Sequence, residues 1–532
     1  MTTKIVFGVS LVILLCVLST KFSYKLGVPA LIFFMFVGML FGTDGIMKIA
    51  YEDFSSAQII CSISLIFIMF EGGFNTKWST ARKYVPKAVL MSTLGVVLTA
   101  LFTTLCCHFF LKLSLAESFL IASVLASTDA ASVFAILKSN NLDLKDGTSP
   151  ILEVESGSND PMAYLLTITA IGIMLTGKAE NIFITIVIQL VVGFVSGIAF
   201  AALARYVLSL KNIVVDGLDT IFIISVTLLC YALTDMLGGN AYLSVYLLGL
   251  TLGNMHIKAK AAVVAFFSDL TSLLQMLIFF IIGLLSTPSG IPQSIPLAFF
   301  IIVILTFVAR PLATILLLMP LKCSLRQCLL ISWAGLRGAS SIVFAITAVS
   351  AGVALSMDLF HVVFMVSLFS IAIQGALLPT IAIKLKMIDE SPNIAKTLND
   401  FDTHADFQFT RLVVDDNSSW IGKRIKDVGL PLGSQAVMIR RDGKNLAARG
   451  KTVIERNDEI ILNVPAYTPS GKERVKELLI GKDHPWANKK VEQLGIPDNE
   501  LIIMLQREDQ GIVPNGDTLI QAGDVLQIYQ GE

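Results

Sequence analysis

The stretch "ESGSNDPMA", residues 155–163, places two carboxylates, two serines, an asparagine and a proline inside an otherwise apolar run, residues 150–175. That run is long enough for a helix that crosses a lipid bilayer, which needs about 20 mostly apolar residues. Charged side chains at the centre of such a helix are costly and indicate a functional position by default. The remaining sequence must therefore show whether the chain spans a membrane and what these polar groups do there.

The composition divides the chain into two chemically different parts. Of its 532 residues, 55% are hydrophobic, compared with about 45–50% in a typical soluble protein, and the mean hydropathy is +0.75. Of the 80 charged residues (40 basic plus 40 acidic), 39 follow residue 390, so the apolar part ends near there. The formal net charge is zero, which gives no electrostatic footprint for a nucleic-acid partner.

Thirteen apolar stretches in the first part are candidates for transmembrane helices. They are residues 5–24, 28–47, 57–74, 86–111, 116–138, 150–176, 180–210, 218–237, 240–255, 262–286, 294–319, 324–352 and 358–388. Lysine and arginine collect in cytoplasmic loops. Alternate connections, beginning after the first span and including the residues after the last one, together hold sixteen of these basic residues, whereas the segments on the opposite side hold four. We therefore predict a polytopic all-α membrane protein with an external N-terminus, a first span that is retained and a cytoplasmic C-terminal region.

The residues that usually bind metals or act as nucleophiles are scattered. The seven cysteines all lie in the apolar part without a CxxC pair, and the five histidines are far from one another and from the acidic stretch. We interpret the cysteines as small apolar packing residues. We expect no structural metal and no catalytic residues, hence a protein that is not an enzyme.

Ionisable residues remain inside the predicted spans. They are Asp129, Glu153, Glu155, Asp160, Arg310 and Arg337, with Glu71 and Asp269 nearer the span ends. Each central charge costs about 2.5–3.5 kcal/mol in a bilayer, so these side chains should face one another or a water-filled cavity. A functional site is the first interpretation. The alternative, a structural salt-bridge network, applies most to Arg310, Glu71 and Asp269.

The spacing within residues 155–163 gathers oxygen ligands. Glu155 and Asn159 share one helical face, as do Ser156 and Asp160. Pro161 has no N–H and leaves the carbonyl four residues earlier without its helical partner. Carboxylate, hydroxyl and backbone oxygens are hard ligands that suit an alkali cation. Because a carboxylate can also take a proton, cation and proton would compete for it, as an exchanger requires.

Two other polar stretches interrupt predicted spans: "ASTDAAS", residues 126–132, and "GLRGASS", residues 335–341. When they are aligned, residues 129–132 match residues 337–340 seven spans later, an odd offset that reverses the direction of the chain. Transporters built from inverted repeats break corresponding helices at the midplane and point the helix ends at the ion site. We therefore predict inverted repeats with broken crossing helices.

The polar tail begins with a proline-containing linker, residues 391–402. Residues 420–462 align without gaps to residues 486–528, and Trp420/Trp486 and Asp458/Asp524 are among the identical pairs. Residues 436–445 are typical of a hairpin, and residues 458–462 and 524–528 of closing strands. We predict two copies of a small α+β unit, residues 403–485 and 486–532, the second truncated at its start. No GxGxxG stretch follows a strand, so we expect no dinucleotide-binding lobe.

Four motifs, in this order, resemble those of the sodium/proton exchanger superfamily, specifically its NhaP-type cation:proton antiporter branch. They are "STDAASVFAIL", "ESGSNDPMA", "VARPL" and "AGLRGA", and the resemblance covers about residues 5–390. Residues 403–485 resemble the TrkA-C domain, the C-terminal RCK lobe found on potassium transporters and channels, and the second copy resembles a transporter-associated domain. The combination is similar to the NhaP-type (CvrA) potassium/proton antiporters.

The resemblance implies a homodimer in the bacterial inner membrane whose thirteen helices form a dimerisation domain and a six-helix core that move in an elevator-like alternation. It implies that Asp160 exchanges cation and proton and that Thr128, Asp129 and Ser156 supply further oxygen ligands. The function implied is K⁺ extrusion with pH and cell-volume homeostasis. No cofactor is expected besides the transported K⁺ (or Na⁺) and H⁺.

The resemblance also assigns outer residues. Glu155 would lie just outside the ligands, and Arg337 would pair with Glu155 or Asn159 and stabilise the crossing helices. Asn159 occupies the place of a second aspartate in electrogenic relatives, so one titrating carboxylate implies electroneutral exchange. Whether Arg310 is functional or structural stays open. We interpret the tail as a regulatory or dimerising module rather than an enzyme, with a small-molecule regulator as a candidate ligand of the TrkA-C domain; a passive stabilising domain is the alternative.

Two alternatives to potassium/proton exchange remain. Oxygen ligands suit Na⁺ as well as K⁺, and the tail favours K⁺ without deciding the selectivity. A cation channel gated by its RCK tail would need a pore loop with a carbonyl filter such as TVGYG, which the sequence lacks.

Overall fold

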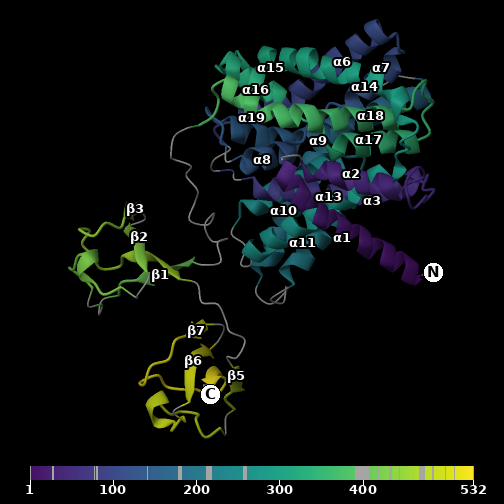
Figure 1. The fold of residues 1–532 in the computed structure, drawn as a ribbon. Helices are drawn as coiled ribbons and strands as arrows, with labels where there is room; N and C mark the ends of the chain where they lie inside the picture. The colour runs from purple at the N-terminus through teal and green to yellow at the C-terminus, as the bar shows by residue number, and fades with distance from the viewer. Residues whose placement is uncertain are drawn as a thin grey trace. The chain divides into compact units, whose positions relative to one another are not determined.

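The computed structural model forms two compact units, Met1–Pro392 and Asn393–Glu532 (Figure 1). The structure describes residues 2–26, 29–76, 78, 82–140, 142–177, 182–210, 218–255, 260–389, 407–415, 418, 420–430, 434–441, 444–465, 474–481, 484–497, 499–507 and 510–530. The predicted linker, residues 391–402, lies outside the described residues.

The first unit consists of helices. They are α1 (Thr2–Leu26), α2 (Ala30–Phe41), α3 (Phe54–Asn75), α5 (Val85–Leu90), α6 (Val96–Leu111), α7 (Leu115–Val124), α8 (Ala130–Ser139), α9 (Thr148–Thr176), α10 (Ile182–Ser209), α11 (Asp219–Met236), α12 (Ala241–Gly253), α13 (Lys260–Leu285), α14 (Ile291–Ile304), α15 (Arg310–Leu318), α16 (Leu325–Trp333), α17 (Ala339–Ser350), α18 (Leu359–Phe369) and α19 (Ala376–Lys384). The π-helical segments η1 (Met91–Gly95), η2 (Leu305–Ala309) and η3 (Ser370–Gly375) join α5 to α6, α14 to α15 and α18 to α19.

Seven helical stretches within the described residues are long and apolar enough to cross a membrane. The helix α10 is an example, because its apolar side chains point in all directions and those of Ile184, Val191 and Phe194 are more than half exposed. A surface helix that is apolar all round suits lipid rather than water. The structure thus confirms that the first unit is largely helical, and its long apolar helices suit a membrane. Each stretch predicted as a span contains one helix or helices in series, but the number of crossings stays a prediction.

Two of the predicted spans are broken at their polar stretches. The first break lies between α7, which ends at Val124, and α8, which begins at Ala130. The second separates α16, ending at Trp333, from α17, beginning at Ala339. The breaks contact each other, because the N–H of Asp129 donates to the carbonyl of Leu336 at 2.8 Å. A Cβ on Gly338 would lie 2.4 Å from an Asp129 carboxylate oxygen, so only glycine permits this approach.

The helix α9 behaves differently, since it continues from Thr148 to Thr176 through Pro161. Neighbouring side chains support it: the amide nitrogen of Asn240 donates to the carbonyl of Pro161 at 2.7 Å. The ring of Tyr246 covers Gly157, where an added Cβ would lie 2.8 Å from a ring carbon. The polar stretch of residues 155–163 is therefore held within a continuous, well-packed helix.

The tail contains two antiparallel four-stranded sheets. The first is formed by β1 (Phe407–Val413), β2 (Gln435–Arg441), β3 (Lys444–Ala447) and β4 (Glu459–Pro465) in the order β1-β4-β2-β3. The second is formed by β5 (Arg474–Leu479), β6 (Glu500–Arg507), β7 (Gln510–Ile512) and β8 (Val525–Gln530) in the order β5-β8-β6-β7. Equivalent buried pairs, Ile439 with Ile460 and Leu505 with Leu526, lie at the centres of the two sheets. The predicted hairpin and closing strands are confirmed.

Two predictions about the tail are wrong. The second unit is not truncated, because β5 supplies the edge strand that corresponds to β1, so this unit begins before residue 486. The units are also not α+β. Within the described part of the tail, the helical segments are the short 3₁₀ turns Ile425–Asp427 and Val491–Gln493. Gly429 and Gly495 follow them within a few residues, and glycine disfavours the continuation of a helix.

Candidate ion-binding site

Asp160 is the central carboxylate of the first unit and is only 4% exposed. The hydroxyl of Ser127, in the first break, donates to one of its oxygens, and the hydroxyl of Ser340, in the first turn of α17, donates to the other at 2.6 Å. No ion pair of Asp160 occurs within the described ranges. A buried carboxylate is therefore held by two neutral donors that come from the two broken helices.

The predicted ligands Ser156 and Thr128 hold the first break against α9. The hydroxyl of Ser156 donates to the carbonyl of Thr128 at 2.9 Å and accepts from the N–H of Ala130 at 2.8 Å. The hydroxyl oxygen of Thr128 accepts from the side-chain amide of Asn159. The two contacts of Ser156 satisfy backbone groups that the break leaves without helical partners.

The predicted ligand Asp129 lies at the start of α8. Its carboxylate accepts from the N–H of Ser132 at 3.2 Å and from the hydroxyl of Ser132 at 2.6 Å. This is the arrangement of a helix N-cap, in which a carboxylate satisfies free N–H groups. The structure thus brings Asp129, Thr128, Ser156 and Asp160 to the same break but links them through different partners.

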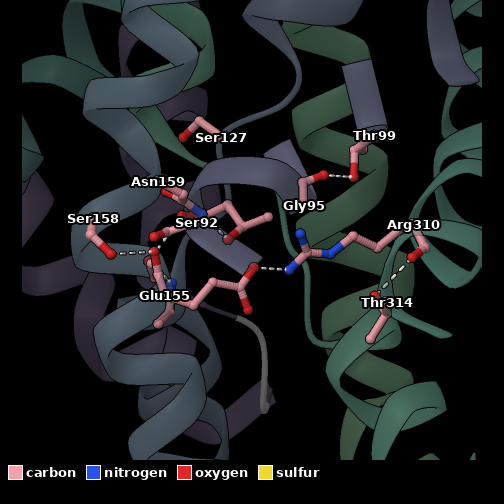
Figure 2. A network of polar contacts seen from close by, with 12 residues as sticks. Ser92, Gly95, Thr99, Ser127, Glu155, Ser158, Asn159, Arg310 and Thr314 are labelled. Atoms are coloured by element: carbon pink, nitrogen blue, oxygen red, sulfur yellow. Dashed lines mark hydrogen bonds and ion pairs between the residues drawn. The ribbon is translucent and has the colours of Figure 1, made fainter. Parts of the chain in front are cut away.

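Glu155 has a charged partner, unlike Asp160. It forms an ion pair with Arg310 of α15, and both side chains are 1% exposed. Figure 2 shows the two side chains pointing toward each other from facing helices. The second oxygen of Glu155 and two nitrogens of Arg310 have no hydrogen-bond partner within the described residues. Arg310 is thus the ion-pair partner of Glu155.

Arg337 does not form the predicted pair with Glu155 or Asn159. Its guanidinium donates to the carbonyl of Ser127 at 2.7 Å, across the contact between the breaks. Arg310 occupies the position next to Glu155 instead. Arg337 therefore connects the two breaks through a backbone oxygen, so its predicted partners were wrong although it does lie between the crossing helices.

The second break is fastened to the π-helical segment η3. The N–H of Arg337 donates to the hydroxyl of Ser370 at 3.0 Å, and this hydroxyl donates to the side-chain oxygen of Gln374 at 3.0 Å. Gln374 also donates to the carbonyl of Trp333 at 2.6 Å, and the indole N–H of Trp333 returns a bond to the carbonyl of Gln374 at 3.0 Å. A π-helical turn frequently accompanies functional sites, and here it fixes the chain just before Ser340.

The other charged residues of the predicted spans lie apart from Asp160. Asp269 and Glu153 are exposed. Glu71, half-buried on α3, accepts from the side-chain amide of Asn75 at 3.0 Å. None of these three carboxylates is joined to Asp160 by a hydrogen bond within the described residues.

Sequence reasoning missed two residues that contact Asp160, namely Ser127 and Ser340. Both lie in the polar stretches that were singled out, and Ser340 even belongs to the internal match. The available signal was a small hydroxyl residue at a predicted break. What the sequence could not supply was the crossing that brings residues 127 and 340 to the same carboxylate.

Comparisons with known proteins identify the families to which the two parts of the chain are similar. The family described as sodium/hydrogen exchanger, transmembrane, matches residues 10–384, and the TrkA-C domain matches residues 409–465 and 475–529. The K(+)/H(+) antiporter NhaP of Alkalimonas amylolytica is 31% identical over 466 residues, covering 86% of this chain and 80% of that protein. The K(+)/H(+) antiporter NhaP2 of Shewanella sp. (strain ANA-3) is 33% identical over 454 residues, covering 83% and 78%.

The fold also matches a solved structure. The sodium proton antiporter MjNhaP1 from Methanocaldococcus jannaschii at pH 8 superposes with a TM-score of 0.63 at 22% identity, over 72% of this chain and 99% of that chain. The resemblance stated from the four motifs is confirmed, as is the expectation of a transporter rather than an enzyme. This chain belongs to the sodium/hydrogen exchanger family and carries a TrkA-C tail.

Proposed function

We propose that this protein is a monovalent cation/proton antiporter that exchanges K⁺ for H⁺ and that both ions compete for Asp160. The surroundings of Asp160 carry the proposal, because this buried carboxylate accepts hydrogen bonds from two serines and has no ion pair within the described residues. A buried carboxylate without a fixed counter-charge is stabilised by a bound cation or by protonation. A site that holds one ion or the other couples their movements in opposite directions.

The exchange is electroneutral in this proposal. Asn159 next to Asp160 is neutral, and the carboxylate of Glu155 is already balanced by Arg310. One carboxylate then carries one cation in one direction and one proton in the other. Asp129, Thr128 and Ser156 contribute oxygens around the same break, as the family motif implies.

The choice of K⁺ rests on the relatives and on the tail. Relatives that are 31% and 33% identical are named K(+)/H(+) antiporters, and the tail matches the TrkA-C domain, where we propose that a small-molecule regulator binds. Exchange of Na⁺ is the alternative. A relative from Aphanothece halophytica, 28% identical over 353 residues, is named a Na(+)/H(+) antiporter.

The same proposal includes the arrangement in the membrane. Thirteen crossings with inverted repeats would place the N-terminus in the periplasm and the tail in the cytoplasm of the inner membrane, in a homodimer. The sixteen-to-four distribution of basic residues between alternate connections supports this orientation. The internal match of residues 129–132 to 337–340 supports the repeat.

The test is a transport assay with purified protein in proteoliposomes that contain a pH-sensitive dye and are loaded with acid. Addition of K⁺ outside should raise the internal pH, and Na⁺ should do so less. Asp160→Ala should abolish the response and Asp160→Glu should retain part of it. Asp235→Asn, a neutralisation of an exposed carboxylate on α11, is the matched control and should behave as wild type.

Three outcomes would contradict parts of this proposal. A wild-type response from Asp160→Ala would refute the site. A larger response to Na⁺ than to K⁺ would assign the protein to Na⁺/H⁺ exchange. A dependence of the rate on membrane potential at zero pH gradient would refute the electroneutral stoichiometry.

A further inference from the structure

Each oxygen of the Asp160 carboxylate has its own serine. Ser127 lies in the chain segment that breaks the first discontinuous helix, and Ser340 begins the second half of the other. The two hydroxyls therefore reach Asp160 from different elements. Neither was expected to contact the site.

The hydroxyls that the motif assigns as ligands are occupied elsewhere. Ser156 uses its hydroxyl both to donate to Thr128 and to accept from Ala130, so it bridges the break. The hydroxyl of Thr128 accepts from Asn159. The oxygens that face Asp160 directly are those of Ser127 and Ser340.

We propose that the hydroxyls of Ser127 and Ser340 are direct ligands of the transported cation. This inference rests on the proposed function and adds two oxygens to the site at Asp160. A serine hydroxyl has one proton to donate and two lone pairs to accept with, and it can rotate. Such oxygens are hard ligands suited to an alkali cation.

Rotation of the two hydroxyls lets them contact Asp160 in its empty, cation-bound and protonated states. With Asp160 ionised and no cation bound, both hydroxyls donate to the carboxylate, as they do in this structure. When a cation binds, the proton-bearing side of each hydroxyl turns away and a lone pair faces the ion. When a proton binds instead, the new carboxyl O–H donates to one hydroxyl oxygen and the other serine still donates to the free oxygen. The proton leaves as the cation arrives, so the charge at the site is balanced.

The separation of the two serines is fixed by the crossing. The N–H of Asp129 donates to the carbonyl of Leu336, and Arg337 donates to the carbonyl of Ser127, so the two breaks move together. Arg337 also donates to the carbonyl of Ser127, while the hydroxyl of this residue faces Asp160. A fixed separation favours one ion radius over another, which makes the pair a determinant of selectivity.

The experiment measures cation affinity in Ser127→Ala and Ser340→Ala with Ser341→Ala as the matched control. Ser341 follows Ser340 on α17 and is fully buried, and its hydroxyl has no hydrogen-bond partner within the described residues. In the proteoliposome assay, Ser340→Ala and Ser127→Ala should each raise the KM for K⁺ about tenfold while Vmax changes less than about twofold. Ser341→Ala should retain the wild-type KM.

Two further measurements separate a ligand from a structural residue. The first is stabilisation of the purified protein against heat by K⁺, which follows the ratio of K⁺ concentration to Kd. Ser340→Ala should need about tenfold more K⁺ than wild type for equal stabilisation. The second is replacement of the hydroxyl itself: Ser340→Thr adds one methyl group but keeps the hydroxyl and should have a KM near that of wild type, whereas Ser340→Cys replaces the hydroxyl by a soft thiol and should not.

The outcomes distinguish this inference from the proposed function. If wild type moves no protons in response to K⁺ or Na⁺, the proposed function itself is refuted. If wild type and Asp160→Ala behave as proposed but both serine-to-alanine variants keep the wild-type KM, only the inference about the serines is overturned. An equal change in Ser341→Ala would overturn it as well. Should Ser340→Ala fail to fold, equal KM values for Ser340→Thr and Ser340→Cys would overturn it.

Discussion

Two carboxylates on the same helix, Asp160 and Glu155, have opposite surroundings. Both side chains belong to α9 and both are buried, at 4% and 1% exposure. Asp160 has two serine hydroxyls as partners, whereas Glu155 has the guanidinium of Arg310. Under the proposed function, the ion that balances Asp160 is the transported cation or the proton, while the charge that balances Glu155 belongs to the protein.

The comparison shows how burial alone fails to identify an exchange site. A buried ion pair whose partner is covalently attached cannot exchange its cation without leaving an uncompensated charge. Neutral donors stabilise a carboxylate but leave its charge available to a mobile cation or proton. The proposal that Asp160 exchanges ions therefore rests on its burial and on its two neutral donors, Ser127 and Ser340.

The largest expected effect separates activity from stability at Asp160. Asp160→Asn should abolish cation-dependent proton movement completely, yet its melting temperature in detergent should equal or exceed that of wild type. The amide oxygen can still accept from a serine, and the cost of a buried charge without a fixed partner is removed. The measurement is a thermal melt of the purified protein beside the proteoliposome assay. A melting temperature well below that of wild type would mean that Asp160 is structural.

Loss of Arg310 should lower the stability of the protein, in contrast to Asp160→Asn, which should remove activity and keep stability. Arg310→Met leaves the charge of Glu155 buried without a partner and should lower the free energy of unfolding by about 3–5 kcal/mol. Glu155→Gln combined with Arg310→Met removes both charges and should recover most of that loss. Unfolding in mixed micelles measures both values. The double variant should still exchange cations for protons, and its complete inactivity would show that Glu155 takes part in the exchange.

The contrast between these carboxylates also shows the reach of the sequence. Hydropathy located the helices, and the polar stretches located both breaks as well as Asp160, because these features are local. The choice between Arg310 and Arg337 as the partner of Glu155 is not local, since both are buried arginines and only the crossing of the breaks decides. For the same reason Ser340 could not be connected to Asp160 before the fold was known.

The wrong prediction that the second tail unit is truncated has the same cause, because it also depends on pairing between segments that are distant in the sequence. The repeat was recognised from identical residues beginning at Trp420 and Trp486, whereas strand β1 lies before Trp420 and strand β5 lies before Trp486. The strands β1 and β5 correspond in their pairing with β4 and β8 rather than in their side chains. Backbone pairing at a sheet edge leaves little trace in the sequence.

Each sheet of the tail also contains a buried carboxylate that, like Glu155, is paired with an arginine. These two pairs extend the comparison to the part of the chain outside the predicted spans. Asp458 is buried and accepts two hydrogen bonds of 2.8 Å from Arg441, and Asp524 is held in the same way by Arg507. Burial disfavours the charge of Asp458, but the bonds from Arg441 and from the N–H of Glu455 outweigh it and hold its pKa below the ordinary value. The pKa of Asp524 is lowered against its burial by Arg507 and the N–H of Gln521.

Asp458→Asn should destabilise the first sheet of the tail by about 1.5–3 kcal/mol, because the ion pair with Arg441 is replaced by a weaker contact between the guanidinium and a neutral amide. A pKa lower in the folded state stabilises the fold above the unfolded value of about 3.9 and loses this contribution as the pH falls through the folded value. The isolated second unit, residues 393–532, should therefore melt at lower temperature below about pH 4.

The equivalent variant in the second sheet provides the control. Asp524→Asn should destabilise the second sheet and leave the unfolding of the first unchanged, and each variant should lose part of the acid sensitivity of its own sheet. Denaturant unfolding at several pH values measures this. Acid sensitivity that is unaltered in both variants would show that these pairs do not determine it.

The smallest expected effect concerns Arg337, a buried cation whose guanidinium donates to a backbone carbonyl rather than to a carboxylate. Arg337→Lys keeps the charge but loses the planar guanidinium that reaches the carbonyl of Ser127. Net loss of one such bond should raise the KM for K⁺ about threefold to tenfold through misplacement of Ser127, with little change in stability. Arg326→Lys, at an exposed position on α16, should have no effect. If Arg337→Lys keeps the wild-type KM while Arg337→Gln raises it, the positive charge itself tunes Asp160. Arg337 would then act on the exchange site as Arg310 acts on Glu155, and the difference between the two carboxylates would be one of distance rather than of kind.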